Sequence, residues 1–354
     1  MGARQVGKTT LLEQMMETVT DKKILNINAD NPTDANILRN KDFSALSSII
    51  GDAEIICIDE AQRIPEIGIT IKLLVDNYKQ NKQIIATGSS SINLLQSTSE
   101  SLTGRKFTYY LYPVSIEEYL QTTDKLAILK EMNNLLRFGM YPEILKASSE
   151  DDKKRRLKEL TSSYLFKDIF EFQHIKNPQV LHDLLKALAL QIGSEVSYSE
   201  LSNVLHIDSK TVERYVDLLE KSFIVFRLAA FSRNKRREIS KNKKIFFYDV
   251  GVRNAVLDNF SSLDKRQDVG HLWENFIISE RIKYREYHRI YSSQNFWKTY
   301  DGSEIDLVEE REGSLFGYEI KYSADTVKIP QKWQEYENAK FEVINKNKLE
   351  GFVY

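Results

Sequence analysis

Short apolar runs alternate with amphipathic stretches along the first 120 residues. The run IICI at positions 55–58 has no polar interruption, which is typical of a strand buried on both faces of a parallel sheet. A similar run at positions 84–86 predicts another such strand. Residues 9–19 space their apolar side chains as a helix does, and we expect one face to carry Leu11, Leu12, Met15 and Met16. We therefore predict an α/β fold built on a parallel sheet.

The pattern changes after position 113. Residues 113–190 are mostly helical in pattern. Residues 197–231 predict a helix capped by Ser197 or Ser199, a tight turn, a second helix capped by Ser209, and a strand. This order is that of a winged helix-turn-helix. We expect the second helix to expose four polar side chains, Lys210, Thr211, Glu213 and Arg214.

A basic segment follows this predicted motif. Residues 233–244 contain seven Lys or Arg and one Glu. A basic hairpin beside such a helix is suited to the phosphates of DNA. Glu213 weakens the positive character of the helix, however, and many winged helices contact only other proteins. DNA and a protein therefore both stand as candidate partners.

The last third of the chain predicts a small α/β unit with acidic positions on several elements. A helix near position 274 carries Glu274, and a strand near position 306 carries Asp306. The next strand carries Glu319 and Lys321, which period-two alternation places on the same face. Such a set is able to bind Mg²⁺ and support phosphodiester cleavage. Same-face ion pairs on an exposed strand are the competing interpretation.

Composition limits the classes of protein that fit. The 354 residues are 42% hydrophobic and 29% charged, with a net charge of −1, so any contact with nucleic acid needs a local patch. The single Cys57 excludes an internal disulfide, and we expect a cytoplasmic protein that does not contact membranes. We predict four structural parts along the chain. They are the α/β unit with the parallel sheet at 1–125, a helical connector at 126–190, the winged helix-turn-helix at 191–262 and the small α/β unit at 263–354.

A glycine-rich loop opens the chain. GARQVGKT fits the pattern G-x-x-x-x-G-K-[ST], in which backbone N–H groups surround a phosphate. Lys8 would contact the β- and γ-phosphates and the hydroxyl of Thr9 would ligate Mg²⁺. We expect six residues of the loop, Gly2, Gln5, Gly7, Lys8, Thr9 and Thr10, to contact the phosphates of a bound nucleotide.

Further polar residues follow the predicted strands. Asp59 and Glu60 end the first apolar run, at the edge where open α/β sheets bind ligands. We expect Asp59 to hold Mg²⁺ through water and Glu60 to activate the attacking water. Ser89 follows the next strand and would sense the γ-phosphate, hold the attacking water or cap the next helix. Arg105 lies in a later loop, as a phosphate-stabilising or a solvated arginine.

These motifs together resemble a known family. GARQVGKTT, IICIDEAQRIP, IIATGSSS, LTGRKF, YPVSIEEYL, FGMYPEIL, YLFKDIF and FFYDVGVRNAVL look like segments of bacterial and archaeal AAA-type ATPases with a C-terminal domain of unknown function. The resemblance covers nearly the whole chain. It implies ATP binding and hydrolysis on a three-layer α/β P-loop core, followed by a helical and winged-helix region. The order Glu, Asp, Glu-x-Lys resembles the superfamily that includes many restriction endonucleases.

The sequence departs from this family at its first residues. Relatives carry a strand directly before the glycine-rich loop, whereas here the loop begins at Gly2. We expect the missing strand to lie beside the one that ends in Asp59, and to be encoded upstream of Met1. Three functions fit: an ATP-driven switch, an ATP-regulated nuclease, or a protein that binds nucleotide without hydrolysing it.

Overall fold

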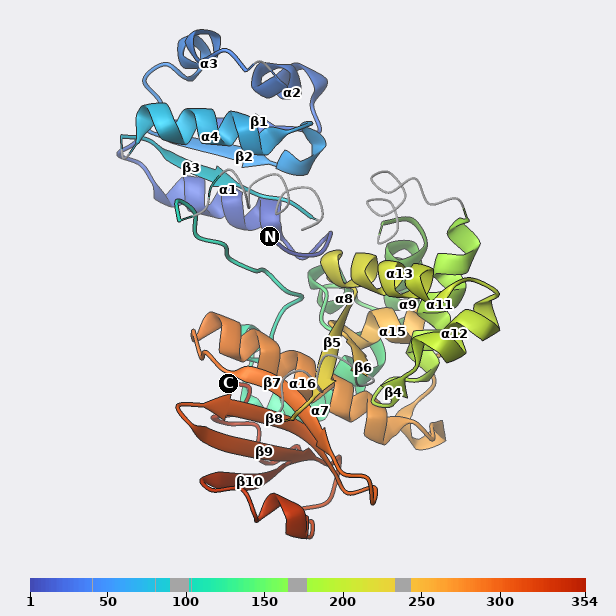
Figure 1. Cartoon of the computed structure of the whole chain (residues 1–354). Coiled ribbons are helices and arrows are strands. Elements are labelled where there is room, and N and C mark those ends of the chain that lie inside the picture. Colours follow the sequence, from blue (N-terminus) through green and yellow to red (C-terminus); the bar gives the residue numbers. More distant parts are fainter. Residues whose placement is uncertain (40, 80, 90–101, 103, 165–176, 233–242) are drawn as a thin grey trace. The chain divides into compact units, whose positions relative to one another are not determined.

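The computed structural model describes the chain except residues 40, 80, 90–101, 103, 165–176 and 233–242. The chain divides into two compact units (Figure 1). The first contains Met1–Leu111, and the second contains most of the chain from Tyr112 onward. Each unit has its own sheet.

The first unit is a parallel sheet with helices. Its three strands lie in the order β1-β2-β3. The elements in chain order are α1 (Lys8–Thr18), β1 (Ile24–Asn28), α2 (Pro32–Arg39), α3 (Phe43–Ile50), β2 (Ile55–Asp59), the 3₁₀ turn η1 (Ala61–Arg63), α4 (Ile67–Tyr78) and β3 (Gln83–Ala86). The predicted strands at 55–58 and 84–86 correspond to β2 and β3.

Both faces of this sheet are covered. Ile56 and Ile58 point to the face on which α2, α3 and α4 bury their apolar side chains, whereas Ile55 and Cys57 face Leu12 of α1. Because β2 is in the middle and covered on both sides, every one of its residues is buried. The expectation for α1 was too broad, since Leu11 and Met15 are 44% exposed. Only one stripe of this helix faces the sheet.

The expected place of the strand before the loop was wrong. Strand β2 already has β1 on one side and β3 on the other. The backbone of Met1 and Gly2 lies elsewhere: Gly2 donates to the carbonyl of Gly88, 3.3 Å away, and Leu111 donates to the carbonyl of Met1, 2.7 Å away. The chain thus enters the loop next to the end of β3, one strand further from β2 than expected.

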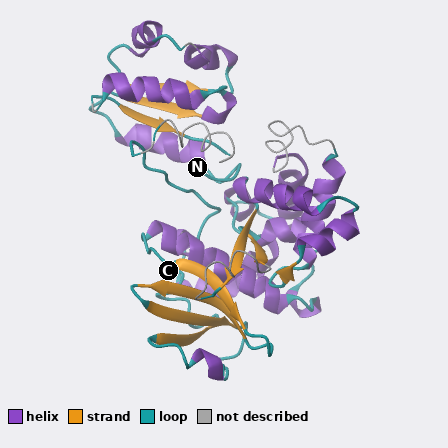
Figure 2. Ribbon diagram, in the orientation of Figure 1, coloured by secondary structure: helices purple, strands orange, loops and turns teal. Residues whose placement is uncertain are grey.

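The second unit contains a seven-stranded mixed sheet (Figure 2). The strand order is β10-β9-β8-β7-β5-β6-β4. The strands are β4 (Glu195–Val196), β5 (Val225–Ala230), β6 (Lys243–Phe247), β7 (Ser293–Lys298), β8 (Glu304–Arg311), β9 (Ser314–Ile320) and β10 (Ala339–Ile344). The parallel pair β5–β7 joins the strands of the predicted winged helix to the C-terminal strands. Elements that the sequence assigned to 191–262 and 263–354 therefore share one sheet.

The second unit also contains helices. In chain order they are α6 (Ile116–Leu120), α7 (Lys125–Phe138), α8 (Pro142–Leu145), α9 (Glu150–Glu159), the π-helical turn η2 (Leu160–Tyr164), α11 (Pro178–Leu190), α12 (Tyr198–Leu205), α13 (Ser209–Lys221), α15 (Val250–Val256), η3 (Leu263–Lys265), α16 (Val269–Tyr287) and η4 (Gln331–Trp333). Trp273 and Phe276 of α16 join the main core with α7, whereas Trp333 of η4 packs on Trp297 and Leu315 in a separate cluster.

The helix-turn-helix appears as α12 followed by α13. Ser197 caps α12, because its side chain accepts a hydrogen bond from the N–H of Glu200. The expected cap of the second helix was wrong: Asp208, not Ser209, accepts from the N–H and the hydroxyl of Thr211. Among the described residues, no helix has the length and apolar character needed to cross a bilayer.

Candidate functional site

The glycine-rich loop turns sharply into α1. Gly7 has φ of 98° and Gln5 has φ of 60°, so the backbone adopts left-handed conformations just before Lys8 starts the helix. Gly2 is equally constrained, because a Cβ at that position would lie 1.9 Å from the carbonyl oxygen of Leu111. The two motif glycines are therefore required for different reasons. Gly7 adopts a left-handed turn, and Gly2 lies too close to the backbone of Leu111 for a side chain.

Lys8 points back into its own loop. Its side chain is buried, and Nζ donates to the carbonyl oxygens of Gly2 (3.0 Å) and Ala3 (2.7 Å). Neutral carbonyls are weaker partners for an ammonium than phosphate oxygens are. A buried ammonium at a helix N-terminus, held by the loop itself, fits a phosphate group.

Thr9 and Asp59 meet at the end of the central strand. The Thr9 hydroxyl donates to Oδ2 of Asp59 at 2.7 Å. The other carboxylate oxygen accepts from the Thr87 hydroxyl and from the N–H of Glu60. A hydroxyl and a carboxylate side by side are the oxygen ligands that Mg²⁺ prefers. The described residues contain no group of three Asp, Glu, His or Cys side chains suited to an ion, so phosphate and water oxygens would have to complete the coordination.

Glu60 is held by its neighbours. It adopts a left-handed conformation, with φ of 50°, directly after β2. Its carboxylate oxygen Oε2 accepts from the amide of Gln62 and from the hydroxyl of Ser89, 3.3 Å away. Ser89 is buried and also accepts from Gln62 at 2.9 Å. Residues after β2 and β3 therefore converge on the Glu60 carboxylate.

The other residues expected at the phosphate site differ in their exposure and in the residues they contact. Thr10 is exposed on α1, and Gln5 is exposed in the loop. Arg105 forms an ion pair with Asp76 of α4 and remains half exposed. Its guanidinium is thus held on the side of α4, and a role in stabilising phosphate stays a prediction. Ser89, which was predicted to follow a strand, lies after β3 and contacts the Glu60 carboxylate.

The C-terminal acidic residues also come together. Asp306 on β8 and Glu319 on β9 both contact Lys321, with distances of 3.7 and 2.7 Å to its Nζ. Burial, together with the nearby carboxylates of Glu274 and Glu319, raises the pKa of Asp306 to about 7. Glu274 on α16 thus belongs to the same electrostatic cluster. The structure brings together all four predicted residues, but those it describes lack a three-ligand metal arrangement.

Lys244 differs most from its expected environment. The sequence placed it in a basic hairpin facing phosphates, whereas it is buried on β6 and pairs with Glu274 (3.1 Å) and Glu304. Burial alone would lower its pKa, but these two carboxylates outweigh burial and raise it. Lys244 is therefore unavailable to a nucleic acid. Residues 233–242 of the basic segment lie outside the described residues.

The helix-turn-helix presents a mixed surface. Lys210, Glu213 and Arg214 of α13 are exposed, as expected, and Thr211 is half buried. Positive and negative side chains alternate on this face, so it lacks the one-sided charge that typically binds DNA phosphates. The structure of this helix therefore does not decide between DNA and a protein as the partner.

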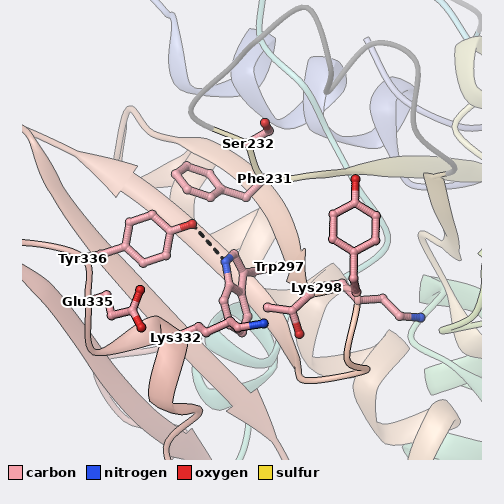
Figure 3. Close-up of a pocket in the computed structure, with 9 residues that line it drawn as sticks. Phe231, Ser232, Trp297, Lys298, Lys332, Glu335 and Tyr336 are labelled. Atoms are coloured by element: carbon pink, nitrogen blue, oxygen red, sulfur yellow. Dashed lines mark hydrogen bonds between the residues drawn. The ribbon is translucent and has the colours of Figure 1, made fainter.

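An aromatic-lined pocket lies near β7 (Figure 3). It has a volume of about 440 Å³, and the indole of Trp297 donates to the hydroxyl of Tyr336 across 3.2 Å. Both lysines in its lining are already paired, Lys298 with Glu195 and Glu304 and Lys332 with Asp301. Trp297 is buried among other rings. The pocket thus shows no unbalanced charge that would recruit a phosphate.

Sequence reasoning missed three residues. Thr87, Gln62 and Lys244 contact the predicted site residues directly. Thr87 and Gln62 carried one available signal, since they lie one and four residues after the end of an apolar run. Lys244 carried none, because it ends the basic segment and its partners Glu274 and Glu304 are distant in the sequence.

Three family profiles match consecutive parts of the chain. An AAA domain matches residues 1–120, a domain of unknown function (DUF8612) matches residues 129–263, and another (DUF4143) matches residues 269–346. The AAA match implies nucleotide binding by the first unit. The expected order, an AAA domain before domains of unknown function, is confirmed. The two later profiles assign no activity.

Curated relatives occur in bacteria and archaea. An uncharacterized protein of Mycobacterium tuberculosis is 28% identical over 323 residues, covering 90% of this chain and 69% of that protein. One of Methanocaldococcus jannaschii is 26% identical over 297 residues, covering 79% and 65%. One of Haemophilus influenzae is 24% identical over 355 residues, covering 95% and 84%. Each is described only as uncharacterized, so none supplies a substrate.

Proposed function

We propose that the first unit binds ATP with Mg²⁺ and hydrolyses it, so that the chain works as a nucleotide-driven switch. The observation that carries this proposal is the 2.7 Å hydrogen bond from Thr9 to Asp59. It brings the end of the phosphate loop and the acidic end of the central strand to one point. A phosphate loop without such a partner would support anion binding only.

The residues of the loop would hold the nucleotide. The backbone from Gly2 to Gly7 would surround the phosphates, with Gln5 and Thr10 as further contacts, and Lys8 would neutralise their charge. Thr9 and Asp59 would hold Mg²⁺, directly or through water. When bound, the ion would offset charge on the β- and γ-phosphate oxygens.

Glu60 would act as the general base. Its carboxylate would accept a proton from water as the water oxygen attacks the γ-phosphorus, and the bond to the β-phosphate oxygen would break to give ADP and phosphate. Ser89 contacts this carboxylate and would report the state of the γ-phosphate to β3. Arg105 would reach the phosphates only after leaving Asp76.

Replacing Glu60 by Gln tests hydrolysis. We expect E60Q to lower ATP turnover at least about 100-fold, the lower end for loss of a general base, while nucleotide affinity changes less than about threefold. The matched control is E54Q, because Glu54 is exposed just before β2. Equal turnover by parent and E60Q would exclude Glu60 as the base. Tight ATP binding without turnover by the parent would favour the non-hydrolysing alternative.

The C-terminal cluster supports a second candidate function, Mg²⁺-dependent phosphodiester cleavage. The supporting observation is the convergence of Asp306, Glu319 and Lys321, with Glu274 coupled to them. Plasmid nicking by the parent, D306N and K321A tests it, with K328A as control because Lys328 is exposed. Loss of nicking in the first two variants alone supports the proposal. Equal nicking by all four proteins contradicts it.

The second unit would pass the nucleotide state to a partner. The mixed charge on the exposed face of α13 favours a protein over DNA. Titrating labelled duplex DNA at two salt concentrations separates these partners, because DNA affinity carried by phosphate contacts falls steeply as salt rises.

A further inference from the structure

Gln62 is a buried neighbour of the proposed general base Glu60. It lies in η1, two residues after Glu60, and its side chain is 3% exposed. Its Nε2 donates both to Oε2 of Glu60 and to the hydroxyl of Ser89. One amide thus ties the residue after β2 to a residue after β3.

The orientation of this amide follows from chemistry. An ionised carboxylate only accepts hydrogen bonds, so the NH₂ end of the amide must face Glu60. The carbonyl oxygen Oε1 is therefore the end of the amide that Glu60 does not contact. It is buried and has no hydrogen-bond partner among the residues that the structure describes. A buried acceptor without a donor destabilises the site, which favours the arrival of a hydroxyl donor beside Glu60.

We propose that Gln62 is a positioning residue that fixes the Glu60 carboxylate and orients the attacking water. The proposal rests on the proposed ATP hydrolysis. The water has two O–H groups. One proton passes to Glu60 while the other O–H donates to Oε1 of Gln62, and this pair of contacts directs an oxygen lone pair at the γ-phosphorus. Gln62 forms no covalent bond and gains no charge.

The arrangement also links water positioning to β3. Ser89 contacts both Gln62 and Glu60, at 2.9 and 3.3 Å. A change at Ser89 therefore alters both groups that would hold the water. An amide with a purely structural role would join the two strand ends in the same way. Removing it would then lower turnover by the same factor whether or not Glu60 is present as a base.

A double-mutant cycle separates these roles. We use Q62M, because methionine keeps the length of the side chain and lacks the amide, together with E60Q and the double variant. The control is Q14M, since Gln14 is exposed on α1. Turnover at saturating ATP, the dissociation constant of a fluorescent ATP analogue and the melting temperature are measured for each full-length protein.

We expect Q62M to lower kcat at least tenfold, with less than a threefold change in nucleotide affinity. Within the E60Q background, Q62M should change residual turnover less than twofold, because Gln62 acts through Glu60 and its water. Q14M should match the parent in all three measurements. Q62E, which keeps acceptor oxygens but cannot donate from an ionised side chain, should also lower kcat.

Two results would overturn the proposal. One is parental turnover by Q62M and Q62E. The other is the same fold loss on adding Q62M to the parent and to E60Q, which would indicate a structural role. An E60Q protein that turns over ATP normally would instead refute the role of Glu60, so the two failures are distinguishable.

Discussion

The hydroxyl of Thr9 donates a hydrogen bond to the carboxylate of Asp59, although fifty positions separate these residues in the chain. Thr9 lies in the first turn of α1, and Asp59 is the last residue of β2. Leu12 of α1 packs on Ile55 and Cys57 of the same strand. The apolar contact thus sets the helix against the sheet and brings the two polar ends together.

Lys8 should govern phosphate binding. K8A removes a buried ammonium, and we expect nucleotide affinity to fall about 10–100-fold, since charged hydrogen bonds contribute about 1.5–3 kcal/mol. Titration with a fluorescent ATP analogue measures this loss. K72A is the control, because Lys72 is exposed on α4 of the same unit. Equal affinities of K8A and K72A would mean that the loop does not hold the phosphates.

Asp59 should govern the need for Mg²⁺. In D59N the carboxylate charge beside Thr9 is lost, so the Mg²⁺ concentration that gives half-maximal turnover should rise at least about tenfold. Nucleotide affinity in EDTA should change little. D21N serves as control, since Asp21 is exposed in a loop. An unchanged Mg²⁺ requirement in D59N would place the ion elsewhere.

Asp268 should stabilise the second unit in a pH-dependent way. It accepts hydrogen bonds from Arg253 and Arg266, at 2.6 and 2.8 Å, and both arginines are buried. Burial opposes ionisation of Asp268, but the hydrogen bonds from Arg266 and Arg253 outweigh it and hold the pKa well below its usual range. D268N should therefore cost about 3–5 kcal/mol near pH 7.

The lowered pKa of Asp268 determines the direction in which stability changes with pH. A depressed carboxyl pKa gives stability that is full above the ordinary value of about 4 and is lost as the pH falls through the folded-state value. The difference between parent and D268N in urea unfolding should shrink below about pH 4. D151N is the control, because Asp151 is exposed in the same unit. A difference independent of pH would contradict this account.

Two glycines near helix starts should respond oppositely to alanine. A Cβ on Gly251 would lie 2.0 Å from the carbonyl oxygen of Phe138, whereas a Cβ on Gly270 would meet no atom within 4 Å. G251A should destabilise by about 1–3 kcal/mol through backbone displacement. G270A should stabilise α16 by about 0.5–1 kcal/mol. Melting temperatures compare the two, and equal shifts would refute the close approach at Gly251.

Local sequence signals were enough to predict the turn of the glycine-rich loop and the buried strand that ends in Asp59. Both are local signals: glycines where the backbone turns or is approached closely, and an apolar run where a strand is buried on two faces. The helix-turn-helix was also predictable, because the periodicity of α12 and α13 is local. The pairing of Glu319 with Lys321 follows from their two-residue spacing, although Lys321 lies one residue beyond the end of β9.

The neighbours of each strand could not be predicted from local signals. The place of Met1 beside the end of β3, and the single sheet that joins β5 to β7, depend on contacts between distant segments. The burial of Lys244 has the same origin, since its carboxylates come from α16 and β8. Local periodicity reports which side of an element is buried, whereas the identity of the partner depends on how the whole chain packs.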